Sequence, residues 1–151
     1  MVRSAGGRVS LDVSSVGLVA HYGLERFIGL LGRVRPDYLS ANRSEAEFLG
    51  LTSGEAAGPT LGRLPGAVLL ARSGDRPTRV FVDGRVVASV PVPRVEVVRD
   101  LTGAVDAFNA GFLTDLLARG WDPEANVAAG HALASRVIAA PGATEVAADG
   151  G

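Results

Sequence analysis

The sequence contains no cysteine and only two histidines, His21 and His131. The lack of thiols excludes disulfides, thiolate catalysis and cysteine-based metal sites. Two histidines also argue against a histidine-rich zinc centre. These absences narrow the kinds of site that the chain can build.

The chain also lacks an excess of charge and a long apolar run. Lysine and arginine number 15 against 16 acidic residues, which gives a formal net charge of −1. This balance gives no electrostatic case for binding nucleic acid or an anionic membrane surface. No apolar run approaches the length of a membrane span, and residues 1–15 lack the apolar core of a signal peptide. We therefore expect a cytoplasmic protein that binds neither nucleic acid nor membrane.

What is present suits a folded core. The 151 residues are 47% hydrophobic and 21% charged, which fits one domain of ordinary size. Short apolar runs predict strands at 8–15, 37–41, 67–72, 79–92 and 95–98. Helical spacing and end signals predict helices at 23–34, 42–51, 104–119 and 122–139. The alternation predicts an α/β layered sheet with one β-hairpin, which turns at Asp83-Gly84.

Local signals refine these elements. Ser44 and Glu47 have the spacing of a capping box at the start of helix 42–51. Residues 55–57 suggest a short helical turn. Asp122 and Pro123 supply the N-cap and first position of the last helix. An apolar stripe on helix 104–119 is expected to face the core; it consists of Val105, Phe108, Phe112, Leu113, Leu116 and Leu117.

The stretch "DLTGAVDAFNAGF" at 100–112 carries the clearest chemical signal. Its helix follows a predicted strand, so the helix N-terminus is expected at the carboxyl edge of the sheet, where open α/β sheets bind ligands. Small residues there let an anion approach unpaired N–H groups. Asp106 has two readings: an acidic residue in the first turn of a common strand-to-helix turn, or a base that takes a proton from an attacking hydroxyl. In the second reading the amides of 103–106 hold the charge of a transferring phosphoryl group.

Four segments resemble the ribokinase-like (PfkB) carbohydrate kinase family. "DLTGAVDAFNAGFL" resembles its C-terminal signature, commonly Asp-Thr-Thr-Gly-Ala-Gly-Asp-Ala-Phe-x-x-Gly, and "ANRSEAEFLGL" is similar to its Asn-x-x-Glu segment. "DVSSVGL" is similar to a strand-end segment midway through such kinases, and "NVAAGHALASRVIAAPGATE" to the last helix and its Pro-Gly-Ala turn. The resemblance implies a three-layer ribokinase-like sheet with flanking helices. Residues 1–143 would form the C-terminal, nucleotide-binding and catalytic-base part, and 144–151 a flexible tail.

The resemblance also implies a reaction, which is transfer of the ATP γ-phosphoryl group to a hydroxyl of a sugar or sugar-like molecule. Asp106 matches the catalytic base, and the anion hole matches Gly103, Ala104 and Val105. Glu45 matches a residue that organises Mg²⁺ indirectly. Nucleotide-binding positions match Asn42, Gly74 and His131. A site for a monovalent cation such as K⁺ matches Asp100, Thr102, Ala140 and Gly142.

Several of these residues have structural alternatives. Asn42 and Glu45 could serve the start of their helix. Asp100 could cap a turn, and His131 could be a partly buried packing residue.

The chain departs from the family pattern at three points. Val105 stands where glycine is usual and is expected to crowd the anion hole. Pro77 replaces the second glycine of the nucleotide loop, here "SGDRPT", and cannot donate an N–H.

The third departure is length, since Met1 falls where a full-length kinase is in mid-chain. The substrate half would be missing, and the sheet edge would need cover from a homo-oligomer or a separate N-terminal-half partner. We expect a weakly active or inactive kinase. The alternatives are a non-enzymatic degenerate paralogue and one subunit of a split kinase.

Overall fold

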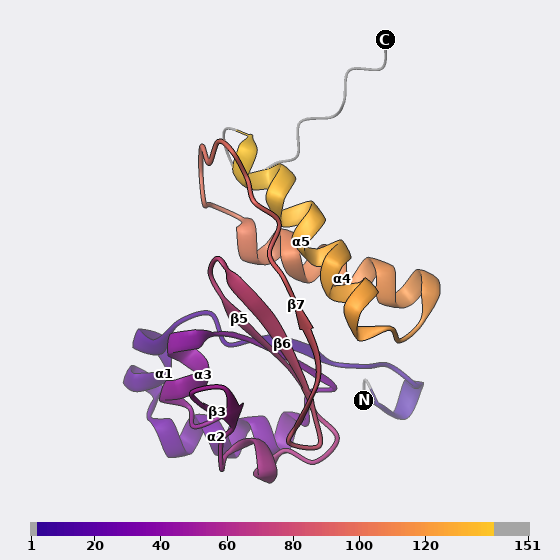
Figure 1. Cartoon of the computed structure of the whole chain (residues 1–151). Coiled ribbons are helices and arrows are strands. Elements are labelled where there is room, and N and C mark those ends of the chain that lie inside the picture. The colour runs from indigo at the N-terminus through magenta and orange to yellow at the C-terminus, as the bar shows by residue number, and fades with distance from the viewer. Residues whose placement is uncertain (1–2, 141–151) are drawn as a thin grey trace. The chain divides into compact units, whose positions relative to one another are not determined.

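The computed structural model of the chain describes residues 3–140, so Gly142 and the predicted tail at 144–151 lie outside the described residues. The chain separates into two compact units, with the boundary between Ser89 and Val90 (Figure 1). Each unit is described by itself. In residues 3–140 no helix has the length and apolar character needed to cross a bilayer.

The first unit is an α/β layer. Its sheet has the strand order β1-β2-β5-β6-β7, in which β1, β2 and β5 are parallel and β6 is antiparallel to β5. The elements are η1 (Arg3–Ala5), β1 (Ser10–Asp12), α1 (Val16–Tyr22), α2 (Leu24–Val34), β2 (Tyr38–Asn42), α3 (Arg43–Phe48), β3 (Thr52–Ser53), β4 (Ala56–Ala57), η2 (Leu61–Arg63), β5 (Val68–Ser73), β6 (Arg76–Val82) and β7 (Arg85–Val90). The predicted α/β sheet with flanking helices is confirmed.

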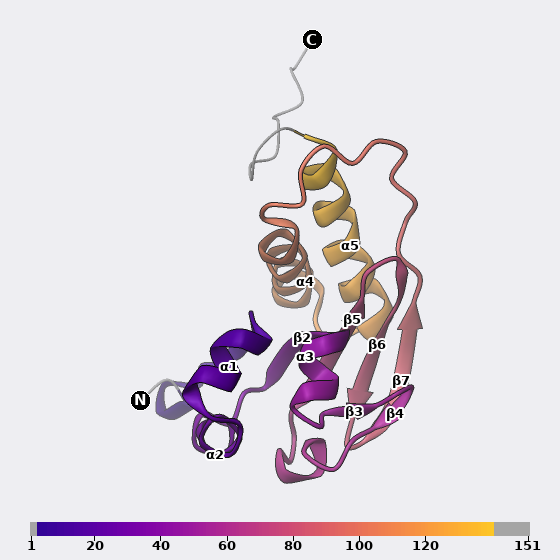
Figure 2. The same cartoon turned by 90° about the vertical axis from the view of Figure 1, so that its left-hand side faces the viewer.

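One face of this sheet meets the helices of the first unit (Figure 2). Leu39 of β2, Leu69 of β5 and Phe81 of β6 belong to one buried apolar cluster. Helices α1, α2 and α3 contribute to the same cluster through Val19, Ile28, Leu31 and Ala46. The parallel register, in which Leu39 lies opposite Leu69, aligns these side chains on that face.

The first unit has two elements that differ from the sequence-based predictions. Helix α1 was not predicted, and it begins at an N-cap in which the Ser15 hydroxyl accepts a hydrogen bond from Leu18 N at 3.3 Å. The helical turn predicted at 55–57 is wrong. These residues belong to the small antiparallel hairpin β3–β4, whose turn places Gly54 at φ +61°. That left-handed conformation suits glycine and reverses the chain without a helical turn.

The sheet contains two hairpins rather than the single one predicted. The turn at Asp83-Gly84 is confirmed, with both residues at positive φ as a two-residue hairpin turn requires. Strand β6 also begins earlier than predicted, at Arg76, so that Gly74 and Asp75 form the turn of hairpin β5–β6. Within segment "SGDRPT", the turn is thus confined to Gly74 and Asp75, and the flanking residues belong to the two strands.

Pro77 lies inside strand β6 because the strand pairing is irregular there. Ala71 pairs with Arg79 and Ser73 with Arg76, so the register shifts between these two pairs. A proline has no N–H for a ladder, and bulges are among the few places in a sheet that tolerate it.

The second unit is a pair of helices, α4 (Ala104–Arg119) and α5 (Pro123–Ala139), which lie side by side in both views (Figures 1 and 2). Gly120 ends α4 as predicted, and Asp122 caps α5 by accepting a hydrogen bond from Ala125 N at 3.1 Å. Trp121 lies in the turn between the helices and is 43% exposed.

Two glycines let the helices approach closely. A Cβ atom added at Gly111 would lie 2.6 Å from the carbonyl oxygen of Ala129. One added at Gly130 would lie 2.8 Å from the carbonyl oxygen of Phe108. The backbones of the two helices are therefore in contact at this crossing, and no side chain larger than the hydrogen atom of glycine fits between them.

The apolar stripe predicted on α4 is correct only in part. Phe108, Phe112 and Leu116 are buried, but Val105 and Leu117 are 37% and 86% exposed. The buried face instead includes small and polar residues that hydrophobicity does not mark, namely Ala107, Gly111 and Asp115.

The strand predicted at 95–98 is absent, because residues 91–100 contain no helix or strand. Val97 and Val98 are more than half exposed. The backbone here bonds to the end of α5, where the N–H groups of Arg99 and Asp100 donate to the carbonyl of Ile138 at 2.8 and 3.3 Å. Helix α4 therefore does not directly follow a strand of the sheet, contrary to the sequence-based prediction.

Candidate functional site

The candidate residues fall into two groups, one in each unit. The first group lies at the start of α3 and in the β5–β6 turn. The second group lies around the N-terminus of α4 and along α5.

Asn42 and Glu45 form the start of α3. Asn42 ends β2, and its Oδ1 accepts a hydrogen bond from Glu45 N at 2.9 Å. Glu45 Oε2 accepts one in return from Asn42 N at 2.8 Å, which completes a capping box. The capping box predicted at Ser44 and Glu47 is therefore wrong. It lies two residues earlier, because α3 starts directly where the strand ends.

The capping role leaves Glu45 with limited freedom for a metal ion. Its side chain is buried, and one carboxylate oxygen is used by the cap. Within residues 3–140, no three His, Cys, Asp or Glu side chains gather as a metal centre. The donor set fits a Mg²⁺ ion held by one carboxylate, phosphate oxygens and water, which is the usual mode for this ion.

Gly74 occupies the turn between β5 and β6. Its φ is +66°, which the turn requires and glycine readily adopts. A Cβ atom there would meet no atom within 4 Å, so the backbone of this turn is open on that side.

The N-terminus of α4 presents unpaired amides. Gly103 is the N-cap in the left-handed region, at φ +78°. Ala104 N donates to Leu101 O at 3.2 Å, and Ala107 N donates to Gly103 O at 2.8 Å. Between them, the N–H groups of Val105 and Asp106 have no hydrogen-bond partner among the described residues. The exposed carboxylate of Asp106 lies in the same turn.

Val105 lies within the helix, where φ suits any L-residue. The glycine that the family pattern usually has there is therefore not needed for its conformational freedom. The effect of valine is limited to the bulk of its branched side chain beside the amides.

Two of the residues expected to hold a monovalent cation, Asp100 and Ala140, lie near the end of α5. Asp100 Oδ1 accepts a hydrogen bond from Thr102 N at 2.8 Å, so Asp100 does cap a turn. Asp100 N donates to Ile138 O, two residues before Ala140, the buried C-cap of α5.

His131 packs within the helix pair. It is 6% exposed, and its ring lies 5.2 Å from the ring of Phe108, centroid to centroid. A role for His131 beside the nucleotide stays a prediction.

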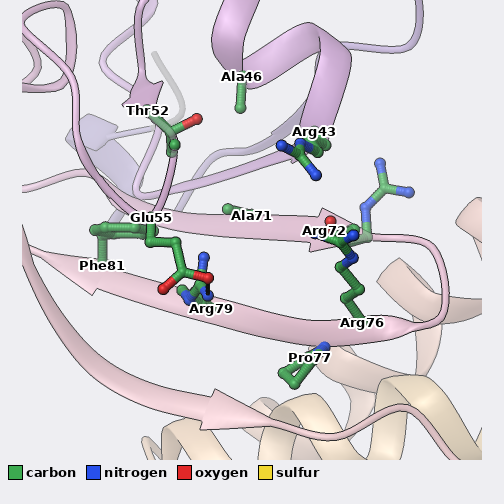
Figure 3. A pocket seen from close by; sticks show the side chains of 12 residues that line it. Arg43, Ala46, Thr52, Glu55, Ala71, Arg72, Arg76, Pro77, Arg79 and Phe81 are labelled. Atoms are coloured by element: carbon green, nitrogen blue, oxygen red, sulfur yellow. Dashed lines mark hydrogen bonds and ion pairs between the residues drawn. The ribbon is translucent and has the colours of Figure 1, made fainter.

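A pocket lined by arginines was missed from the sequence. It lies in the first unit between α3, the β3–β4 hairpin and the β5–β6 hairpin (Figure 3). Arg43, Arg72, Arg76 and Arg79 all line it. Three of these arginines lie within residues 72–79. They line one pocket because the turn at 74–75 brings strands β5 and β6 together, and this turn was not predicted from the sequence.

The chain is similar to a family of kinases in sequence and in fold. The pfkB family carbohydrate kinase profile matches residues 31–149. Among curated proteins no match was found. Among solved structures, adenosine kinase from Sinorhizobium meliloti is 26% identical with a TM-score of 0.78. The matched region covers 93% of this chain and 42% of that one. A probable sugar kinase protein from Rhizobium etli is 26% identical with a TM-score of 0.75, with 90% and 40% covered.

A third structure supports the fold alone. The putative Ribokinase II from E. coli, in complex with ATP and Mg²⁺, is 19% identical with a TM-score of 0.73, and 94% of this chain covers 46% of that one. This chain thus spans less than half the length of these structures. The profile match over most of the chain, together with the shared fold, shows that the chain belongs to the pfkB family of carbohydrate kinases.

Proposed function

We propose that this chain provides the nucleotide-binding and catalytic-base part of an ATP-dependent kinase that phosphorylates a hydroxyl of a sugar or sugar-like molecule. Because the chain spans less than half the length of its structural relatives, we expect it to be weakly active or inactive by itself. The observation that carries the proposal is the α4 N-terminus, where the unpaired amides of Val105 and Asp106 adjoin the exposed Asp106 carboxylate.

The chemistry divides between these groups. ATP with Mg²⁺ supplies the phosphoryl group when it is bound. The amides at the start of α4 donate hydrogen bonds to the developing negative charge, because a helix N-terminus offers unpaired donors and the positive end of a dipole. The Asp106 carboxylate takes the proton of the attacking hydroxyl. Glu45 contributes its charge to the Mg²⁺ ion, while Asn42, Gly74 and His131 bind the nucleotide.

The first test is isothermal titration of the purified chain with Mg-ATP. We expect Glu45→Gln to weaken binding by about tenfold, the scale of one lost charge-assisted contact, while the helix start survives because glutamine also completes a capping box. Asp106→Asn should retain ATP binding, because a base that faces the acceptor hydroxyl contributes little to nucleotide affinity. Glu124→Ala is the control, since it removes an exposed first-turn carboxylate from α5.

The proposal fails if the folded chain binds no Mg-ATP, or if Glu124→Ala weakens binding as much as Glu45→Gln. Circular dichroism of each variant establishes that the chain is folded.

A second candidate function is non-enzymatic, as a degenerate paralogue or as one subunit of a split kinase. The bulk of Val105 beside the anion-binding amides favours it. In the same titration, Val105→Gly should create or strengthen Mg-ATP binding if valine is the lesion. An unchanged affinity would show that the valine is compatible with binding, and the role of a partner carrying the acceptor site would then be tested by adding a kinase N-terminal half.

A further inference from the structure

The arginine-lined pocket of the first unit has no role in the function proposed above. Its walls come from α3, from the turn of β3–β4 and from both strands of the β5–β6 hairpin. Four arginines line it, and Glu55 is its one lining carboxylate among the described residues.

The arginines differ in how they are held. Arg72 is fixed, because it pairs with Asp12 at 2.9 Å and donates to Ser40 Oγ at 3.0 Å. Arg43 pairs with Glu47 one helical turn later, and both side chains are largely exposed. Such a pair contributes little stability, so a ligand could recruit Arg43 at small cost.

Arg76 is the available cation of the pocket. It stands at the first position of β6 and has no ion pair or hydrogen bond through its side chain among the described residues. Each of the other three arginines pairs with one carboxylate. The exposed guanidinium of Arg76 therefore adds one positive charge that no carboxylate of the pocket balances.

A carboxylate already occupies the other end of the pocket. Glu55 lies in the turn of β3–β4, and its side chain is 82% exposed, yet it pairs with Arg79 (Figure 3). Arg79 is partly buried, with a side chain 28% exposed. The ion pair shows that the Arg79 guanidinium lies within reach of an oxyanion at this end of the pocket.

The irregular pairing of β6 gives the pocket two cationic ends. Residues three apart on a regular strand face opposite sides of the sheet. The register shift at Pro77 places both Arg76 and Arg79 on the pocket, at a spacing of roughly 10 Å along the strand. This spacing suits a ligand with anionic groups at both ends.

We propose that this pocket binds a small polyanion, with one anionic group on Arg76 and the other on Arg79, in place of the Glu55 carboxylate. The shared chemistry is an oxyanion, either carboxylate or phosphate, since guanidinium binds both in the same bidentate geometry. The pocket borders segment 73–78, which carries Gly74, but the proposal assigns the anion to Arg76 and Arg79 and not to Gly74, Asn42 or His131. It therefore goes beyond the kinase function.

The test titrates the full chain at low ionic strength with two probes, citrate for carboxylates and tripolyphosphate for phosphates. We expect saturable binding of at least one probe, weakened about tenfold or more by Arg76→Gln and by Arg79→Gln. Glu55→Gln should strengthen binding severalfold, because it frees Arg79 from its competitor. Arg33→Gln removes an exposed charge from α2, outside the pocket, and should leave the affinity unchanged.

Three outcomes would overturn the proposal: no binding of either probe by the folded chain, equal weakening by Arg33→Gln, or no gain from Glu55→Gln. The preferred probe tells carboxylate from phosphate. Competition with Mg-ATP separates this site from the kinase site, since a probe that binds equally well to the ATP-saturated chain does not share its site.

Discussion

At the scale of single residues, Asn42 and Glu45 show how one pair can serve both fold and chemistry. Each side chain accepts the other's backbone N–H, so the two residues build the start of α3. This arrangement also holds the Glu45 carboxylate in one orientation. A role toward Mg²⁺ would then rest on a carboxylate that the fold has already positioned.

The capping box gives a prediction about stability. Asn42→Ala removes the acceptor of Glu45 N and should lower the free energy of unfolding by about 1 kcal/mol. Ser44→Ala changes a neighbouring residue that is not the N-cap, and should alter it by less than about 0.5 kcal/mol. Urea denaturation of the full chain measures both. A larger loss of unfolding free energy for Ser44→Ala than for Asn42→Ala would contradict the capping box at Asn42 and Glu45.

At the scale of elements, the sequence predicted best where a signal is local. Helices α2, α4 and α5 follow from apolar spacing and from end signals such as Asp122 and Gly120, which act within a few residues. Strand β5 follows from its continuous apolar run.

The predictions that were wrong concern features that depend on residues distant in the sequence. Segment 95–98 is rich in valine, but a strand needs a neighbour, and the backbone of Arg99 and Asp100 bonds to the end of α5 instead. The buried side of α4 depends on Gly111 and Gly130, whose importance appears only where the helices meet. For the candidate site, the motif and the expected helix start predicted unpaired amides at the start of α4, but no sequence pattern predicted the arginine pocket.

The helix pair gives a prediction at this scale. Gly130→Ala places a methyl group 2.8 Å from the carbonyl oxygen of Phe108, so we expect overpacking to cost about 1–3 kcal/mol of stability. Gly29→Ala is the matched control, because a Cβ atom there meets nothing within 4 Å. In an exposed helix alanine should gain about 0.5–1 kcal/mol over glycine. Thermal unfolding measures the stability of both variants. Equal shifts of the melting temperature would contradict a close contact between the helix backbones at Gly130.

At the scale of the whole molecule, the chain consists of two compact units that join near Ser89 and Val90. The segment after the boundary, residues 91–100, has neither helix nor strand. Candidate nucleotide residues occur in both units, with Asn42 in the first and His131 in the second. The proposed kinase function therefore requires both units.

This division predicts a site of limited proteolysis. Arg94 and Arg99 are exposed within residues 91–100, so trypsin should cut after one of them before it cuts elsewhere in residues 3–140. Mass spectrometry of a brief digest should then show two fragments that meet at 94/95 or 99/100. An Arg94→Gln, Arg99→Gln double variant should survive longer. A first cut after Arg79, inside a paired strand, would contradict the division.

The position of Trp121 has a consequence for spectroscopy. It is the only tryptophan in the sequence, and it lies in the turn between α4 and α5, whereas both tyrosines, Tyr22 and Tyr38, belong to the first unit. Indole emission therefore reports on the helix pair, and the tyrosine signal reports on the first unit, through Tyr22 of α1 and Tyr38 of β2. The native chain thus carries one intrinsic chromophore type in each half, and the loss of structure in each half can be followed without a label.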